Sequence, residues 1–217
     1  MQDLYESWNA LRYGGPMVYP LLALAVIMVA ILLDKAYVYW RYARLPAVLV
    51  RLIEHPGTRW SDLERQVAAL DPRNCFARFL RTILRDRTQP SWWIESRAGD
   101  EAQAIERDLS RGLWVLETIV TAAPLLGLLG TITGMMRAFH LIGSKGLVDP
   151  NGVTSGVAEA LIATALGLLI ALIALFGFNF FARLQSRTLD EMERVGTRVA
   201  DRIRLGAQDP EVRHEAA

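Results

Sequence analysis

The amino-acid sequence predicts an all-α membrane protein with three transmembrane helices, long cytoplasmic helical extensions, an outside N-terminus and an inside C-terminus. The first observation behind this prediction is that three stretches carry no charged residue, namely residues 13–33, 118–136 and 160–182. A helix rises about 1.5 Å per residue, so about 20 residues are enough to span the hydrocarbon core, and each stretch is that long. With 52% hydrophobic residues segregated in this way, a soluble enzyme is excluded.

The second observation is the distribution of basic residues around these stretches. Of the 24 Lys and Arg residues, 14 lie in residues 34–117 and 7 follow residue 182, whereas only 2 lie in residues 137–159. Basic residues are enriched in cytoplasmic segments, which places the N-terminus outside and the C-terminus inside. Acidic residues nearly balance the basic ones in residues 34–117, so this region predicts salt-bridged helices and no nucleic-acid-binding surface.

The chain is expected to begin with an interfacial helix on the outer side, residues 1–13, ahead of the first span at residues 14–33. The apolar residues of the first segment share one helical face, which is typical of a helix lying in the interface. Asp3 and Glu6 stand where a cleaved signal peptide would carry basic residues, so a signal peptide is not expected. Beyond the membrane the first helix is expected to continue, since nothing breaks it before Pro46 and only Pro56-Gly57 stops it firmly.

The cytoplasmic region, residues 34–112, predicts short amphipathic helices separated by turns. Asp71-Pro72 and Gln89-Pro90 mark two breaks. Ser61 and Glu64 have the spacing of a capping box, which predicts that a helix begins after Ser61.

The second span, residues 113–137, is expected to continue without a break from an amphipathic helix on its cytoplasmic side. Pro124 lies inside this span and should kink it, because proline removes one backbone donor and crowds the preceding turn. An outer loop at residues 138–152 then leads to the third span, residues 153–182. The apolar pattern persists past the membrane, which predicts a cytoplasmic C-terminal helix and tail in residues 183–217.

Four glycines in the spans, Gly127, Gly130, Gly134 and Gly167, are expected to pack helices against one another. A run of glycines can suggest a phosphate-binding loop, but these glycines lie in apolar segments. Small residues spaced four apart, as Gly130 and Gly134 are, let helices approach closely in a membrane. Helix packing is therefore the favoured interpretation.

Glu159 is the sharpest candidate for chemistry, because it opens the third span and is followed by a long uncharged stretch. An ionisable group at membrane depth usually faces a cavity or a partner and marks an ion pathway. The alternative is that water reaches Glu159 at the outer interface, and its position alone leaves both interpretations open. Thr131 and Thr133 of the second span supply hydroxyls that could extend a proton path. Glu117 at the inner interface is a weaker candidate, for which snorkelling is the ordinary explanation.

Residues 123–136 and 157–167 together resemble the MotA/TolQ/ExbB proton-channel family. The two segments read APLLGLLGTITGMM and VAEALIATALG, in this order on the second and third spans. The three-span topology resembles the ExbB and TolQ branch, with the ExbB type favoured. One departure is Thr133, at a position where the family often carries an aromatic residue.

The resemblance implies a homopentamer in the bacterial inner membrane whose second and third spans line a pore. A single-span partner of the ExbD/TolR type would pass through that pore and bring a membrane aspartate. The family's pore-lining polar positions fall on Thr131, Glu159 and Thr164 of this chain. Proton flow would then drive rotation and energise a TonB- or TolA-type transducer for outer-membrane transport.

Two other functions stay open at this point. One is a TolQ-like role in envelope integrity and cell division, and the other is a membrane scaffold that does not conduct ions, for which the long projecting helices would suffice. No cofactor site is expected, because no nucleotide or dinucleotide fingerprint is present. No metal site is expected either, since the chain offers one cysteine, Cys75, and three scattered histidines.

Overall fold

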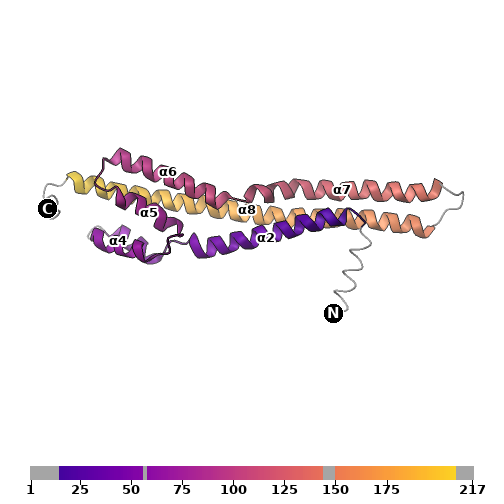
Figure 1. Ribbon diagram of the computed structural model, residues 1–217, viewed down its shortest axis with the longest axis horizontal. Coiled ribbons are helices and arrows are strands. Elements are labelled where there is room, and N and C mark those ends of the chain that lie inside the picture. Colours follow the sequence, from indigo (N-terminus) through magenta and orange to yellow (C-terminus); the bar gives the residue numbers. More distant parts are fainter. Residues whose placement is uncertain (1–14, 56–57, 144–149, 209–217) are drawn as a thin grey trace, which may run out of the picture. The chain divides into compact units, whose positions relative to one another are not determined.

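The computed structural model describes residues 15–55, 58–143 and 150–208, and all regular secondary structure in them is α-helical (Figure 1). The helices are, in chain order, α2 (Val18–Tyr42), α3 (Ala47–Glu54), α4 (Trp60–Ala69), α5 (Cys75–Arg85), α6 (Ser91–Ser110), α7 (Leu113–Gly143) and α8 (Pro150–Gln208). Three helical stretches, in α2, α6–α7 and α8, are long and apolar enough to cross a membrane. This confirms the all-α class with three long apolar helices. The expected interfacial helix at residues 1–13 lies outside the described residues.

The chain divides by its internal contacts into two compact units. The apolar unit comprises Met1–Leu33 and Gly112–Phe181, and the charged unit comprises Asp34–Arg111 and Ala182–Ala217. Two of these boundaries fall within one residue of the ends of the first and third uncharged stretches. At these two boundaries the change in composition and the change in packing therefore coincide.

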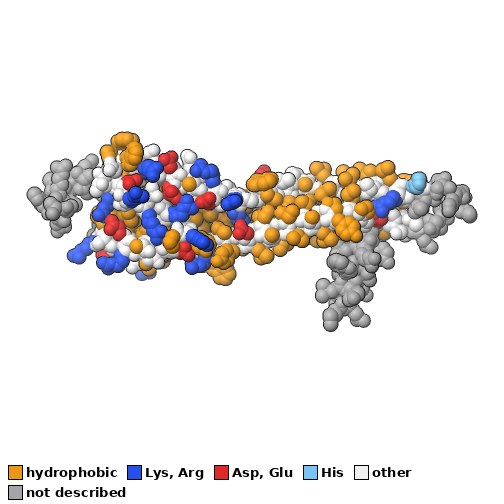
Figure 2. Space-filling view, in the orientation of Figure 1, with side chains coloured by type: hydrophobic (Ala, Val, Ile, Leu, Met, Phe, Trp, Pro, Cys, Tyr) orange, Lys and Arg blue, Asp and Glu red, His pale blue; other side chains and the backbone are white. Residues whose placement is uncertain are grey.

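The apolar unit is built from α2, α7 and the first part of α8, with small residues where α7 and α8 meet. Gly127 and Gly167 lie opposite one another, and a Cβ at Gly167 would stand 3.1 Å from the Gly127 Cα. The other side of each helix carries large apolar residues that are exposed, such as Leu125 and Phe176 at 65% and 68%. Figure 2 shows hydrophobic side chains gathered over α7 and α2. Exposed apolar surface of this extent fits a lipid environment.

The charged unit has an apolar core beneath a surface of Lys, Arg, Asp and Glu (Figure 2). Asn74 caps the N-terminus of α5, because its Oδ1 accepts hydrogen bonds from the backbone N–H groups of Phe76 (3.0 Å) and Ala77 (3.1 Å). The buried Lys35 Nζ donates to the Leu109 carbonyl at 3.0 Å, in the last turn of α6. This cation therefore stabilises a helix C-terminus, where carbonyl groups lack partners within the helix.

One expectation that the structure overturns is the continuous helix leading into the second span. α6 ends at Ser110 and α7 begins at Leu113, with Arg111 and Gly112 between them. Gly112 has a φ of +86°, a conformation that glycine adopts without the strain a side chain would bring. The sequence pattern of apolar residues runs through this point, and the glycine breaks the helix nevertheless.

Two smaller boundaries also differ from the sequence-based expectations. α2 ends at Tyr42, before Pro46, and α3 begins after it. Ser61 is no N-cap, since α4 begins at Trp60 with Arg59 as its cap. α7 extends to Gly143 and α8 begins at Pro150, so helical residues flank the segment expected to be an outer loop on both sides. The breaks expected at Asp71-Pro72 and Gln89-Pro90 are confirmed.

Candidate functional site

The carboxylate of Glu159 is held by an arginine from the neighbouring helix. Glu159 lies on α8 with 16% of its side chain exposed, and the Nη2 of Arg137 on α7 donates a hydrogen bond to its Oε1. The Arg137 side chain is 49% exposed, so this pair lies at the edge of the packed helices and not deep among them. An ion pair in this position fixes the direction of the carboxylate.

Gly15, which precedes α2, also lies against the carboxylate of Glu159. A Cβ built on Gly15 would stand 1.4 Å from the Glu159 Oε1, so the carboxylate packs directly against the Gly15 backbone. Gly15 also has a φ of +68°, which disfavours any larger residue. Three parts of the apolar unit therefore meet at Glu159: the segment before α2, the end of α7 and the start of α8.

Thr164 links α8 to α7 through its hydroxyl. Its Oγ1 donates a hydrogen bond to the Gly127 carbonyl at 3.0 Å, a bond between residues of different helices. Because a helix carbonyl already accepts one bond within its own helix, Gly127 uses its second lone pair for Thr164. The close approach of α7 and α8 at Gly127 makes this bond possible.

The two hydroxyls of the second span bond within α7. Thr131 Oγ1 donates to the Leu128 carbonyl at 2.7 Å, and Thr133 Oγ1 donates to the Gly130 carbonyl at 3.1 Å. Such bonds to the preceding turn are common for threonine in helices. They occupy the hydroxyl proton but leave the oxygen free to accept a further hydrogen bond.

The three residues predicted to form an ion pathway thus have different partners. Glu159 pairs with Arg137, Thr164 bonds Gly127, and Thr131 bonds its own helix. Glu159 and Thr164 are five residues apart on α8, which separates them by about 7.5 Å along the axis and about 140° around it. These polar groups therefore lie at different places along α7 and α8 and do not form a single cluster.

The predicted packing glycines all lie on the α7–α8 contact. A Cβ at Gly130 would stand 2.4 Å from the Ala163 Cβ, and one at Gly134 would stand 2.9 Å from the Ala160 Cβ. Pro124 lies inside α7, and the helix continues through it. Glu117 is exposed near the beginning of α7.

Sequence reasoning missed Arg137 and Gly15 as members of the site. Arg137 directly follows the second uncharged stretch and Glu159 directly precedes the third. In a pair of antiparallel helices joined by a short connection, such residues come to lie opposite one another, so the signal for Arg137 was present. Gly15 could not be found in this way, because its contact depends on how the start of α2 packs.

Comparison with known proteins adds to this geometry. The MotA/TolQ/ExbB proton channel family matches residues 72–194, more than half of the chain. Two ExbB-like biopolymer transport proteins of Synechocystis sp. are 31% identical (over 85% of this chain and 74% of theirs) and 33% identical (over 80% and 84%). The biopolymer transport protein ExbB of Aquifex aeolicus is 39% identical over 40% of this chain and 59% of its own.

Proposed function

This chain belongs to the MotA/TolQ/ExbB proton channel family, and we propose that it is the ExbB-type subunit of a proton-driven complex in the bacterial inner membrane. Its relatives are biopolymer transport proteins, which supports a transport role. In this proposal the subunit forms a homopentamer around a single-span partner of the ExbD/TolR type. Proton flow through the pore energises a TonB- or TolA-type transducer.

The observation that carries the proposal is the partly buried carboxylate of Glu159. It stands at the start of a long uncharged helical stretch and is packed between Arg137 and the Gly15 backbone. A carboxylate that is partly shielded and has a defined partner can alternate between an ion-paired state and a protonated state. A proton arriving at Glu159 would release Arg137, and the release of that proton would restore the pair.

Thr131 and Thr164 would continue the path along the α7–α8 contact. Each hydroxyl O–H donates a hydrogen bond to a carbonyl, and its oxygen retains lone pairs that can accept a hydrogen bond from water. In the proposed pentamer, water held against these oxygens would carry the proton from Glu159 to the aspartate of the partner. Arg137 and Glu159 would lie toward the outer end of this path.

Proton flux in liposomes tests the proposal. The chain is reconstituted with its single-span partner, a membrane potential is imposed, and an internal pH-sensitive dye reports proton entry. We expect Glu159→Gln to reduce flux to the level of protein-free liposomes, because it keeps the shape and removes the titrating group. Thr164→Val should reduce flux about threefold to tenfold, the range expected for one lost hydrogen bond.

Glu191→Gln is the matched control, because Glu191 lies on the same helix in the charged unit and pairs there with Arg194. This variant should conduct like the wild type. Undiminished flux in Glu159→Gln, with the complex intact by size-exclusion chromatography, contradicts the proposal.

A scaffold that conducts no ions is the second candidate, and the Arg137–Glu159 pair is the observation in its favour. A half-exposed ion pair can serve to lock two helices together without moving any proton. In that case the wild type itself would give no flux with its partner, and Glu159→Gln would alter only the stability of the complex.

A further inference from the structure

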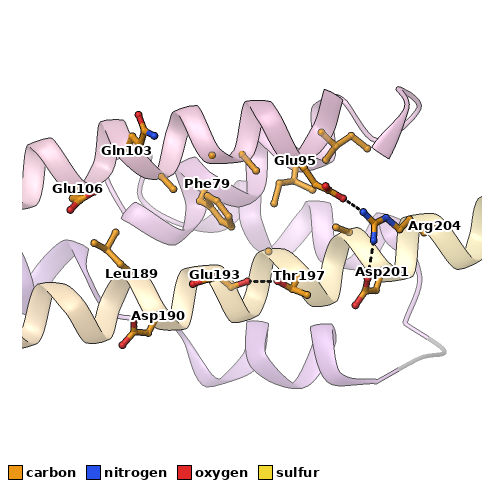
Figure 3. A pocket seen from close by; sticks show the side chains of 17 residues that line it. Phe79, Glu95, Gln103, Glu106, Leu189, Asp190, Glu193, Thr197, Asp201 and Arg204 are labelled. Atoms are coloured by element: carbon orange, nitrogen blue, oxygen red, sulfur yellow. Dashed lines mark hydrogen bonds and ion pairs between the residues drawn. The ribbon is translucent and has the colours of Figure 1, made fainter. Parts of the chain in front are cut away.

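A groove in the charged unit lies between α6 and α8 and is independent of the Glu159 site. Its volume is about 610 Å³, and Phe79 and Ile83 of α5 form part of its floor (Figure 3). The α8 residues that line it recur every three or four positions from Leu189 to Arg204, so one face of this helix forms the wall. Figure 3 shows α6 along the opposite side, with Phe79 between the two helices.

The groove is long. A second hollow of about 280 Å³ shares Glu106, Leu189 and Asp190 with the first and extends to Ala182. From Ala182 to Arg204 the wall formed by α8 is about 33 Å long, at 1.5 Å per residue. These dimensions suit a stretch of polypeptide better than a compact small molecule.

The floor of the groove is apolar and its walls carry small residues. Phe79, Ile83 and Ile94 are buried at the bottom. Gly196 packs against the Phe79 ring, and a Cβ at Gly99 would meet nothing within 4 Å, so the α6 wall is open there. The groove therefore has room for side chains supplied by another molecule.

The rim is strongly acidic. Five carboxylates line the groove, those of Glu95, Glu106, Asp190, Glu193 and Asp201. The single basic residue in the lining is Arg204, which pairs with Glu95 and Asp201. Among the described residues, the other three carboxylates have no ion pair with a basic side chain. Their charge is available to a ligand of the opposite sign.

We propose that this groove binds a basic amphipathic segment of a partner protein. Aliphatic or aromatic side chains of the segment would occupy the floor at Phe79, and its Lys or Arg side chains would pair with Glu106, Asp190 and Glu193. An acidic segment would be repelled by the rim, and a purely apolar one would leave the three carboxylates without partners. The mode is that of an amphipathic segment lying in an apolar groove, with charge complementarity selecting the basic partner.

Binding of a synthetic peptide to the purified full-length complex tests the proposal. The probe is a fluorescent peptide of about twelve arginine and leucine residues, with leucines at helical spacing, and anisotropy measures its binding. The control probe has glutamate in place of arginine. We expect the basic peptide to bind and the acidic one not to bind, and added salt to weaken the binding, since it screens exposed charges.

Substitutions on the two faces of α8 locate the binding. Asp190→Asn together with Glu193→Gln should weaken binding about fivefold to tenfold, as expected for two exposed charge pairs. Glu191→Gln is the matched control, because Glu191 lies between the two in sequence but does not line the groove. Equal effects of the double variant and this control, or no effect of either, overturn the proposal.

Labelling at Gly99 distinguishes a partner segment from a second copy of this chain. In a Cys75→Ser background, Gly99→Cys places a thiol on the open wall of the groove. We expect a maleimide to label it in the intact complex and the basic peptide to protect it. A thiol that is unreactive until the subunits are dissociated would mean that a second copy covers the groove, which also overturns the proposal.

Discussion

Replacing Gly167 by alanine tests whether the small residues of α7 and α8 set the distance between these helices. A Cβ at this position would stand 2.5 Å from the Ala123 carbonyl oxygen and 3.1 Å from the Gly127 Cα. Both obstacles are backbone atoms, which cannot rotate away as the end of a side chain can. Ordinary contact begins at 3.4 Å, so the two helices must separate by about 0.9 Å at this point.

The cost of this separation follows from what the two helices lose. Overpacking of a well-packed contact costs about 1–3 kcal/mol. The Thr164–Gly127 hydrogen bond lies in the same part of the α7–α8 contact. Alanine recovers up to about 1 kcal/mol of helix propensity. The net loss is then about 0–2 kcal/mol, and for a chain of this size 1 kcal/mol corresponds to about 2–4 °C, so the melting temperature of Gly167→Ala should fall by up to roughly 8 °C.

The melting temperature is measured by tryptophan fluorescence in detergent, and two further glycines serve as controls. A Cβ at Gly177 would lie nearest the tip of the Leu32 side chain, which can rotate. Gly177→Ala should therefore lower the melting temperature less than Gly167→Ala does. Gly99→Ala meets nothing and should raise the melting temperature by about 1–4 °C through helix propensity alone. If Gly167→Ala melts above the wild-type temperature, the helices are not held at the distance described, and the reasoning fails.

Three other predictions concern single side chains. Asn74→Ala should lower the free energy of unfolding by about 1–3 kcal/mol, because it removes the cap of α5 and the 3.0 Å hydrogen bond to the Arg44 carbonyl. Ser61→Ala is the control: it removes no cap and should change the free energy of unfolding by less than about 0.5 kcal/mol. Burial raises the pKa of the Cys75 thiol, so less thiolate is present at neutral pH. A maleimide should therefore label Cys75 at least about tenfold more slowly than an exposed cysteine. Equal labelling rates would contradict the burial of Cys75. Arg137→Gln should raise the Glu159-dependent proton flux up to about fivefold, because the proton no longer displaces a cation; unchanged flux means that the pair does not limit conduction.

The three apolar helices could be predicted from the sequence because lipid imposes a strong constraint on composition. A charged residue in the middle of a span is costly, so the spans are visible as uncharged stretches without any knowledge of packing. The same constraint explains why the boundary between the two units at Leu33 coincides with the end of the first uncharged stretch. Glu159 could be singled out for the same reason.

The helix ends in the charged unit were harder to predict, because they depend on single residues and not on composition. Gly112 interrupts an apolar pattern that continues on both sides of it, and only its positive φ reveals the break. Ser61 has the spacing of a capping residue, yet Arg59 caps α4. The groove on α8 could not be predicted at all, since its lining comes from three helices whose packing the sequence pattern does not specify.

The pairing of Arg137 with Glu159 follows from the register of α7 against α8. The contacts of Gly127 with Gly167, and of Gly134 with Ala160, join residues at equal distances from a centre near residue 147. The same register puts position 137 opposite position 157, about 3 Å along the axis from Glu159 and within reach of a long side chain. The small residues that fix this register therefore also bring the two charges together. Gly167→Ala is accordingly expected to alter the Glu159-dependent flux as well as the melting temperature, whereas Gly177→Ala, which does not contact α7, should leave the flux unchanged.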